Sequence, residues 1–248
     1  MSDDTWGGGY ATWNVSRTDG PLGPICNTSL HDGYSMTCYT SCGDCSYLQD
    51  SCDWTSCHDD LAYTEAVLYQ VLATYCVDTD SIHLSGASNG GMFLYTRVLP
   101  ALSASLASLA PVAASPLRGF NSLPDSPVNI IDFHGILDDI IPYAPGGPND
   151  LGPGPDDTTI SSDGYYYLQK MVYLTDILTA MNCNMESSDY ETEMDGEEGW
   201  SCIIWTGCDE GKEVVHCNGA WPHMYPFLGG VEGFRIMWRF LKDHPLTQ

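Results

Sequence analysis

The sequence predicts an α/β fold in which a mostly parallel sheet is flanked by helices. From residue 58 onward, short apolar runs alternate with segments of helical periodicity, as in strands joined by crossover helices. A chain of 248 residues can bury one sizeable core, and 43% of its residues are hydrophobic. These observations exclude a generally disordered chain and predict a single domain.

The first 57 residues are expected to form a Cys-rich loop region that packs on the core. Six of the 11 cysteines lie between Cys26 and Cys57, and glycine and proline clusters interrupt any regular period. This density favours disulfides formed in an oxidising compartment, and the odd total leaves one free thiol or an intermolecular bridge. The alternative is a zinc site, whose four ligands would be Cys42, Cys45, Cys52 and Cys57.

Residues 58–248 are expected to form the α/β core. A helix with acidic residues in its first turn opens this part at residues 58–76. The elements that follow are a strand at 82–85, a helix at 92–99, strands at 106–114 and 128–133, a helix at 165–181, strands at 202–206 and 213–217, and a helix at 231–241. The two longest loops are predicted at 145–157, which is rich in Gly, Pro and Asp, and at 186–198, where many carboxylates leave calcium binding as the alternative.

The charge of the chain restricts its partners. Eight basic residues against 33 acidic ones give a formal net charge of −25. Such a charge argues against nucleic acids and anionic membrane surfaces as partners, and no apolar stretch is long enough for membrane insertion. A neutral small-molecule or polymeric substrate fits better. The simplest explanation of the acidity is solubility in a salty or extracellular medium.

Two features bear on localisation. Glycosylation sequons at Asn14 and Asn27 are consistent with secretion, as is the density of cysteines. Residues 1–6, however, have neither the basic start nor the apolar run of a signal peptide. We therefore expect an extracellular glycoprotein, although no signal peptide is present in the sequence.

The strongest chemical signal is the sequence Gly-Ala-Ser-Asn-Gly at residues 86–90, a G-x-S-x-G motif between a predicted strand and a predicted helix. A nucleophilic serine sits at such a strained turn because the glycines let the backbone pass closely and the helix N-terminus favours developing negative charge. The motif predicts Ser88 as a nucleophile. The alternative is a structural turn that merely requires small residues.

Two later strands each end in a loop that carries acid–base side chains. The strand at 128–133 is followed by Asp138 and Asp139, at the sheet edge where sites assemble. Either aspartate could orient a catalytic histidine, and either could instead be a turn or N-cap residue. The strand at 213–217 contains His216 and is followed by His223. Serine, aspartate and histidine in this order are expected for an α/β-hydrolase.

With these motifs, most of the chain resembles the secreted polyhydroxybutyrate depolymerases and feruloyl or acetylxylan esterases of the α/β-hydrolase superfamily. The elbow of this family, G-x-S-N-G-G, is present at residues 86–91 and implies Ser88 as the nucleophile. Its H-G-x-x-D-x-x-[VI]-P-Y motif is present at residues 134–143 and implies Asp138, rather than Asp139, as the acid.

The histidine motif of the family, G-x-H-x-W-P, is displaced. The W-P part of this motif is present at Trp221 and Pro222, but the residue two positions before Trp221 is not a histidine. A histidine followed by x-aromatic-P occurs instead at residues 223–226. The resemblance therefore carries the role of the base to His223. His216 is the alternative, although a histidine in a buried strand is more often a satisfied core residue than a base.

The resemblance implies a secreted serine esterase that hydrolyses polyhydroxyalkanoate, feruloyl or acetyl-polysaccharide esters through an acyl-enzyme. Ser88, His223 and Asp138 would be catalytic, and the backbone N–H of Asn89 would donate to the oxyanion. No metal or organic cofactor is expected. A catalytically silent binding or structural relative of the same fold is the alternative, favoured by the displaced histidine and the unusual N-terminus.

One part of the implied fold is missing from the sequence. An α/β-hydrolase places a strand beside the one before the nucleophile, and the loop after that strand, often beginning His-Gly, supplies the second oxyanion N–H. No apolar run before Cys57 ends in His-Gly. We therefore expect this strand and loop to lie upstream of Met1, in an N-terminally truncated sequence.

Overall fold

A computed structural model describes residues 12–15, 24–25, 39–40, 59–162, 164–190, 200–224 and 232–246. The chain divides into two compact units, residues 1–77 and 78–248. The first contains helix α1 (Asp60–Thr74) and two short paired strands, β1 (Pro24–Ile25) and β2 (Tyr39–Thr40). The predicted helix with an acidic first turn is present, with Asp60 in that turn, and the Asp59 side chain caps α1 by accepting from a backbone N–H. The domain boundary expected after residue 57 stays a prediction.

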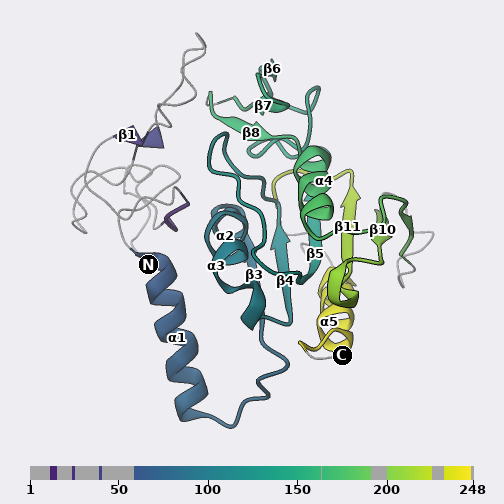
Figure 1. The fold of residues 1–248 in the computed structure, drawn as a ribbon. Coiled ribbons are helices and arrows are strands. Elements are labelled where there is room, and N and C mark those ends of the chain that lie inside the picture. The colour runs from purple at the N-terminus through teal and green to yellow at the C-terminus, as the bar shows by residue number, and fades with distance from the viewer. Residues whose placement is uncertain are drawn as a thin grey trace. The chain divides into compact units, whose positions relative to one another are not determined.

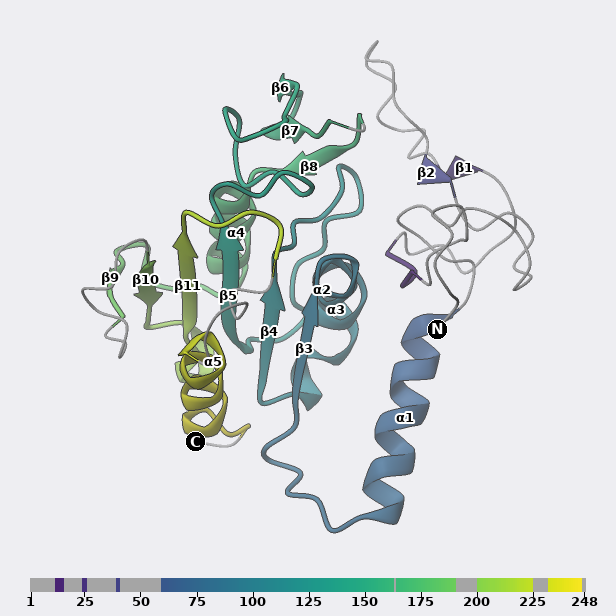
Figure 2. The ribbon, with the colours of Figure 1, turned by 180° about the vertical axis from the view of Figure 1, so that it is seen from behind.

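The second unit is built on a six-stranded sheet in the order β3-β4-β5-β11-β10-β9 (Figures 1 and 2). The strands are β3 (His83–Ala87), β4 (Ser108–Val112), β5 (Asn129–Gly135), β9 (Ser188–Asp189), β10 (Trp200–Trp205) and β11 (Val214–Gly219). The first four in the sheet are mutually parallel, whereas β10 and β9 continue it antiparallel. The mostly parallel sheet agrees with the predicted α/β class.

Helices cover both faces of this sheet. They are α2 (Asn89–Phe93), which continues through a π-helical turn (Leu94–Val98) into α3 (Leu99–Leu102), then α4 (Lys170–Ala180) and α5 (Glu232–Asp243), with short 3₁₀ turns at Ser103–Ser105 and Asp209–Gly211. Figures 1 and 2, seen from opposite sides, show α4 and α5 on opposite faces of the sheet. Most helices and strands therefore lie where the sequence predicts them, within a few residues.

Side chains alternate between these two faces along the central strands, as the pleat of a strand requires. Ile131 and Phe133 of β5 pack in an apolar cluster with Phe240 of α5. Asp132, between them on β5, points to the other face, where it pairs with Lys170 of α4. The α5 face is therefore an apolar core, whereas the α4 face contains buried charged groups.

The segment before α4 differs from the prediction. A small antiparallel sheet forms here from β6 (Gly152–Pro153), β7 (Thr158–Ile160) and β8 (Tyr166–Leu168). The predictions of a helix beginning at 165 and of an unbroken loop at 145–157 were wrong. Tyr167 is fully buried opposite Thr159, so strand pairing and burial outweigh the helical spacing of the apolar residues. The two-residue strand β9 likewise falls in the loop predicted at 186–198, of which residues 191–198 lie outside the described part.

Two disulfides, Cys183–Cys208 and Cys202–Cys217, join residues of the second unit. The six cysteines from Cys26 to Cys57, including the alternative zinc ligands, lie outside the described residues, as does the sequon at Asn27. The Asn14 side chain is fully buried, so glycosylation there is not supported. Within the described residues, no helix has both the length and the apolarity needed to cross a membrane.

Candidate active site

Ser88 lies at a sharp turn between β3 and α2. Its backbone φ is 54°, a left-handed value that is rare for a residue with a side chain and costs about 1–3 kcal/mol. The turn is held because the Ser88 N–H donates to the carbonyl of Val112 on the neighbouring strand at 2.9 Å. At Ser88 the chain therefore turns away from the direction of β3, at the carboxyl end of the parallel sheet.

Two glycines allow this turn to close. A Cβ atom on Gly86 would lie 2.6 Å from the carbonyl oxygen of Gly90, and one on Gly91 would lie 2.6 Å from the Cβ of Ala114. Contacts this short do not occur, and the first of them is with backbone that cannot rotate away. The spacing of the glycines in the motif therefore follows from the close approach of β3 to the first turn of α2.

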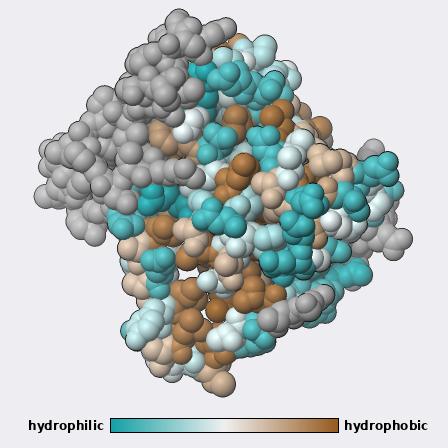
Figure 3. Space-filling model, viewed as in Figure 1, coloured by the Kyte–Doolittle hydropathy of each residue, from teal (hydrophilic) through white to brown (hydrophobic). Residues whose placement is uncertain are grey.

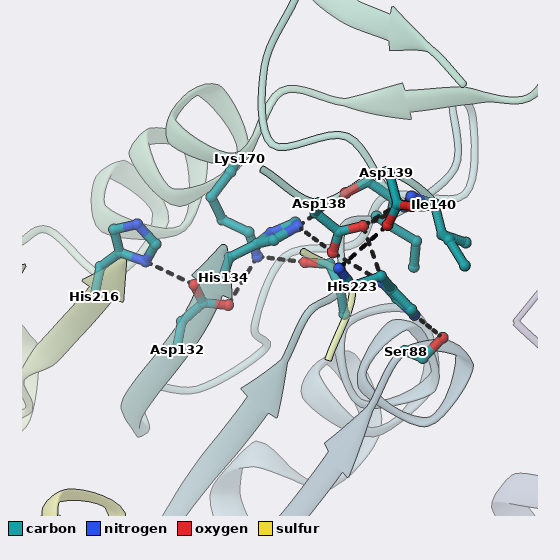
Figure 4. Close-up of polar contacts among 11 residues, drawn as sticks. Ser88, Asp132, His134, Asp138, Asp139, Ile140, Lys170, His216 and His223 are labelled. Carbon is teal, nitrogen blue, oxygen red and sulfur yellow. Dashed lines mark hydrogen bonds and ion pairs between the residues drawn. The ribbon is translucent and has the colours of Figure 1, made fainter. Parts of the chain in front are cut away.

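The three residues that the sequence nominated lie in one chain of hydrogen bonds (Figure 4). The Nε2 atom of His223 is 2.8 Å from the Ser88 Oγ. Its Nδ1 atom is 2.9 Å and 3.0 Å from the two carboxylate oxygens of Asp138. Because the carboxylate accepts from Nδ1, the Nε2 atom is left to accept the serine proton.

Asp138 is fully buried, but its carboxylate accepts several hydrogen bonds. Its Oδ1 accepts from the N–H groups of Ile140 at 3.0 Å and Ile141 at 2.8 Å, and its Oδ2 is 3.2 Å from the Nε2 of His134. Burial by itself would raise the pKa of this carboxyl, but the hydrogen bonds from His134 and His223 outweigh burial and lower the pKa to about 2. Asp138 therefore stays ionised across the ordinary pH range.

The two alternatives from the sequence take other positions. Asp139 accepts from the backbone N–H of His223 at 3.4 Å and so contacts the main chain rather than the ring. His216 lies within β11, fully buried, and its Nδ1 pairs with Asp132 at 2.7 Å. The structure thus brings His223, not His216, to Ser88.

Sequence reasoning assigned no role to three buried residues behind the site, His134, Asp132 and Lys170. Lys170 Nζ donates to Asp132 Oδ1 at 2.7 Å and also to the carbonyl of Ala114. Two signals could have drawn attention to them. Asp132 and His134 are polar residues on one face of an otherwise apolar strand, and Lys170 falls in a segment with an apolar helical face.

The expected oxyanion donor lies next to Ser88 in the chain. Asn89, the expected donor, is the first residue of α2 and directly follows Ser88. No group of three or more His, Cys, Asp or Glu side chains within the described ranges is arranged to hold a metal ion.

Comparison with known proteins gives a partial similarity. No protein-family model matches the chain. A stretch of 84 residues, 34% of the chain, is 32% identical to the bifunctional acetylxylan esterase/xylanase XynS20E of Neocallimastix patriciarum. The match spans 12% of the length of that protein. The similarity indicates an esterase-like relationship over part of the chain.

Proposed function

We propose that this protein is a serine esterase with an α/β-hydrolase fold, which cleaves carboxylic esters through an acyl-enzyme. The observation that carries the proposal is the continuous hydrogen-bond chain from Ser88 Oγ through His223 to Asp138, together with the left-handed φ of Ser88. The partial similarity to an acetylxylan esterase supports the same reaction class. The two disulfides are compatible with an extracellular location, which we include in the proposal.

In the first half of the reaction, Ser88 Oγ attacks the ester carbonyl while His223 Nε2 takes the serine proton. Asp138 holds the other ring nitrogen of His223 protonated and stabilises the imidazolium that forms. The oxyanion of the tetrahedral intermediate accepts from the backbone N–H of Asn89. The intermediate collapses when His223 gives its proton to the leaving alcohol, and the acyl group remains on Ser88.

In the second half, His223 takes a proton from a water molecule, and the resulting hydroxide attacks the acyl carbonyl. His223 then returns the proton to Ser88 Oγ, and the carboxylic acid leaves. The position of His223 suits both halves, because its side chain is hydrogen-bonded to Ser88 Oγ and is still 14% exposed, so that water can reach it.

Exposed apolar side chains close to Asp138 in the sequence favour an uncharged substrate. Ile136, Leu137 and Ile140, which flank Asp138, are 41–43% exposed. Figure 3 shows hydrophobic patches among hydrophilic ones on the surface that it presents. Apolar side chains at a site in a chain of net charge −25 suit neutral esters, so acetylated polysaccharides, feruloyl esters and polyhydroxyalkanoates are the substrate classes to test.

A fluorophosphonate probe tests the proposal directly, because it forms a covalent bond only with an activated serine. We expect the wild-type protein to be labelled and Ser88→Ala to be neither labelled nor active, with ester hydrolysis reduced by more than ~10³-fold and the fold unchanged. The matched control is Ser85→Ala, three residues earlier on β3, where the hydroxyl donates to the Ala110 carbonyl and plays no part in the reaction.

Labelling that survives in Ser88→Ala, or its absence in wild type, would remove the esterase proposal and leave a catalytically silent relative. For a labelled protein, turnover of acetylated xylan, feruloyl esters and hydroxybutyrate oligomers then ranks the substrate classes. The wild-type rates are compared with those of Ser88→Ala on each substrate, so that spontaneous hydrolysis is subtracted.

A further inference from the structure

A second chain of carboxylate, imidazole and hydroxyl lies behind the proposed catalytic one. The Asp132 Oδ2 accepts from His216 Nδ1 at 2.7 Å, and His216 Nε2 is 3.0 Å from the hydroxyl of Tyr143. Asp132 and His216 are paired in register on β5 and β11, and both are fully buried. In the view of Figure 4, His216 and Ser88 lie at opposite ends of the drawn group.

The protons in this inner chain have defined positions. Burial lowers the pKa of His216 and outweighs the opposing effect of Asp132, so its ring is neutral. Because Nδ1–H donates to Asp132, Nε2 is the acceptor, and the Tyr143 hydroxyl donates to it. Burial, followed by the charge of Asp132, raises the pKa of Tyr143 to about 12, so the phenol keeps its proton.

Asp132 is held ionised by its other partners. Its Oδ1 accepts from Lys170 Nζ at 2.7 Å and from the Tyr95 hydroxyl at 2.5 Å. Burial would raise the pKa of Asp132, but Lys170 and His216 outweigh burial and hold the pKa below its usual range. The ionised carboxylate in turn fixes the His216 tautomer that presents Nε2 to Tyr143.

Tyr143 lies in the same loop as Asp138, between β5 and β6. The two residues are joined by a short segment in which Ile141 donates its N–H to Asp138 and accepts at its carbonyl from His134 Nε2 at 2.9 Å. The Tyr143 carbonyl accepts from the N–H of Lys170 at 2.9 Å. The Tyr143 hydroxyl thus ties this loop to β11, the strand that leads to His223: it donates to His216 and accepts from the side chain of Asn218 on the same strand.

We propose that His216 is a positioning residue of the active site: by accepting from the Tyr143 hydroxyl, it fixes the loop that presents Asp138 to His223. This inference rests on the proposed function, because positioning has meaning only if Asp138 and His223 act on Ser88. His216 contacts none of the reacting atoms itself. It keeps the acid and the base, which follow different strands, in one relative position.

Loss of this tie should lower kcat rather than raise KM. The Asp138 carboxylate would keep its own donors but could shift relative to His223, and displacements of about 1 Å at a catalytic group cost up to ~10²-fold. His216 is fully buried and the Tyr143 hydroxyl is bonded to it, so we expect substrate binding to be little changed. We therefore expect a kcat lower by about 10- to 100-fold at an unchanged KM.

Two substitutions of His216 separate positioning from a general contribution to stability. His216→Gln places an amide oxygen near the Nε2 position, where it can accept from Tyr143, but removes the donor to Asp132. His216→Asn keeps a donor near the Nδ1 position but leaves the Tyr143 hydroxyl without its acceptor. We expect kcat per probe-reactive site to fall about 10- to 100-fold in His216→Asn and to be largely restored in His216→Gln, although both proteins are less stable.

Tyr143→Phe is the second variant, which keeps the inference testable where a His216 variant fails to fold. It should reproduce the kcat loss of His216→Asn. Its matched control is Tyr173→Phe, which also removes a buried tyrosine hydroxyl, one that donates to the Ser122 carbonyl at 2.7 Å. Tyr173→Phe should lower stability without changing kcat per probe-reactive site.

The outcomes distinguish this inference from the proposed function. A wild-type protein that neither hydrolyses esters nor reacts with the fluorophosphonate probe overturns both. An active wild type with unchanged kcat in Tyr143→Phe, or with equal kcat in His216→Asn and His216→Gln, overturns the positioning role and leaves the esterase proposal intact.

Discussion

Two carboxylate–imidazole pairs occupy neighbouring positions on the same two strands and their loops, and the hydroxyl that completes each pair decides what it can do. Ser88 is a half-buried residue at a strained turn, in contact with a histidine near the surface. Tyr143 is a phenol whose pKa is raised to about 12, in contact with a fully buried histidine. The Ser88 hydroxyl, at the strained turn, is the one that the proposed reaction uses, whereas the Tyr143 phenol keeps its proton and is bonded to the buried ring of His216.

The acid of the outer group makes a prediction about stability in acid. The pKa of Asp138 is lowered to about 2 in the folded protein, from an ordinary value near 3.8. A carboxyl with a lowered pKa stabilises the fold above the unfolded-state value and loses that contribution as the pH falls through the folded-state value. We therefore expect Asp138 to contribute about 2 kcal/mol at pH 5 and to lose most of it by pH 2.

Urea unfolding of wild type and Asp138→Asn between pH 2 and 5 measures this contribution. The difference in unfolding free energy between the two proteins should shrink by about 2 kcal/mol as the pH falls across that range. Other carboxyls, including Asp132, are present in both proteins, so their contributions cancel in the difference between the two unfolding free energies. Parallel curves for the two proteins would show that Asp138 is not held ionised by its neighbours.

At the scale of secondary-structure elements, local chemistry explains what the sequence predicts and what it does not. The turn at Ser88 can be predicted from the sequence because the small residues that it requires all lie within residues 86–91. Helix α4 was extended too far toward its N-terminus because Tyr166–Leu168 has apolar residues compatible with a helix, and only pairing with β7 makes it a strand. Elements defined by their own residues are predictable, whereas those defined by a distant partner are not.

The same distinction applies to the candidate site. Ser88, Asp138 and His223 could be nominated because each stands in a short motif at the end of a strand. The contact of Lys170 with Asp132 joins residues 38 positions apart, and its importance depends on complete burial that no local pattern reveals. The inner chain was therefore missed, although His216 was recognised as a strand residue.

The elbow provides a prediction at this scale. In Gly86→Ala, the new Cβ would lie 2.6 Å from the Gly90 carbonyl oxygen, so the first turn of α2 must move away from β3. We expect the unfolding free energy to fall by about 1–3 kcal/mol and ester hydrolysis to fall at least ~10-fold, since Ser88 moves with that turn.

The control is Gly147→Ala, where the nearest atom to the new Cβ lies at 3.6 Å, an ordinary contact distance. Its stability should stay within about 0.5 kcal/mol of wild type. Chemical denaturation and ester turnover, measured on both variants, provide the comparison. Equal behaviour of the two would mean that the elbow tolerates a side chain and that the glycine spacing has another origin.

At the scale of the whole molecule, covalent links and charge set the conditions under which the fold exists. A net charge of −25 keeps molecules apart in solution but makes the folded chain repel itself. The cross-link Cys202–Cys217 joins the antiparallel pair β10 and β11 next to His216. The strand that contains His216 and leads to His223 is thus tied to its neighbour by more than hydrogen bonds.

The state of the cysteines gives the prediction that belongs to this scale. Of 11 cysteines, four form the two described disulfides, and Cys76 is free and exposed. We expect alkylation of the native, non-reduced protein to modify Cys76, on the order of one thiol per chain, because an odd number of cysteines cannot pair completely. Cys76→Ser should abolish this modification.

Peptide mapping by mass spectrometry locates the modified residue and the surviving links. Peptides that contain Cys202 and Cys217 should remain joined until a reductant is added, and so should those that contain Cys183 and Cys208. Alkylation of Cys202 or Cys217 without reduction would contradict the pairing. Modification of most cysteines would argue for a reducing compartment and against the proposed extracellular location, since disulfides persist only where the medium is oxidising.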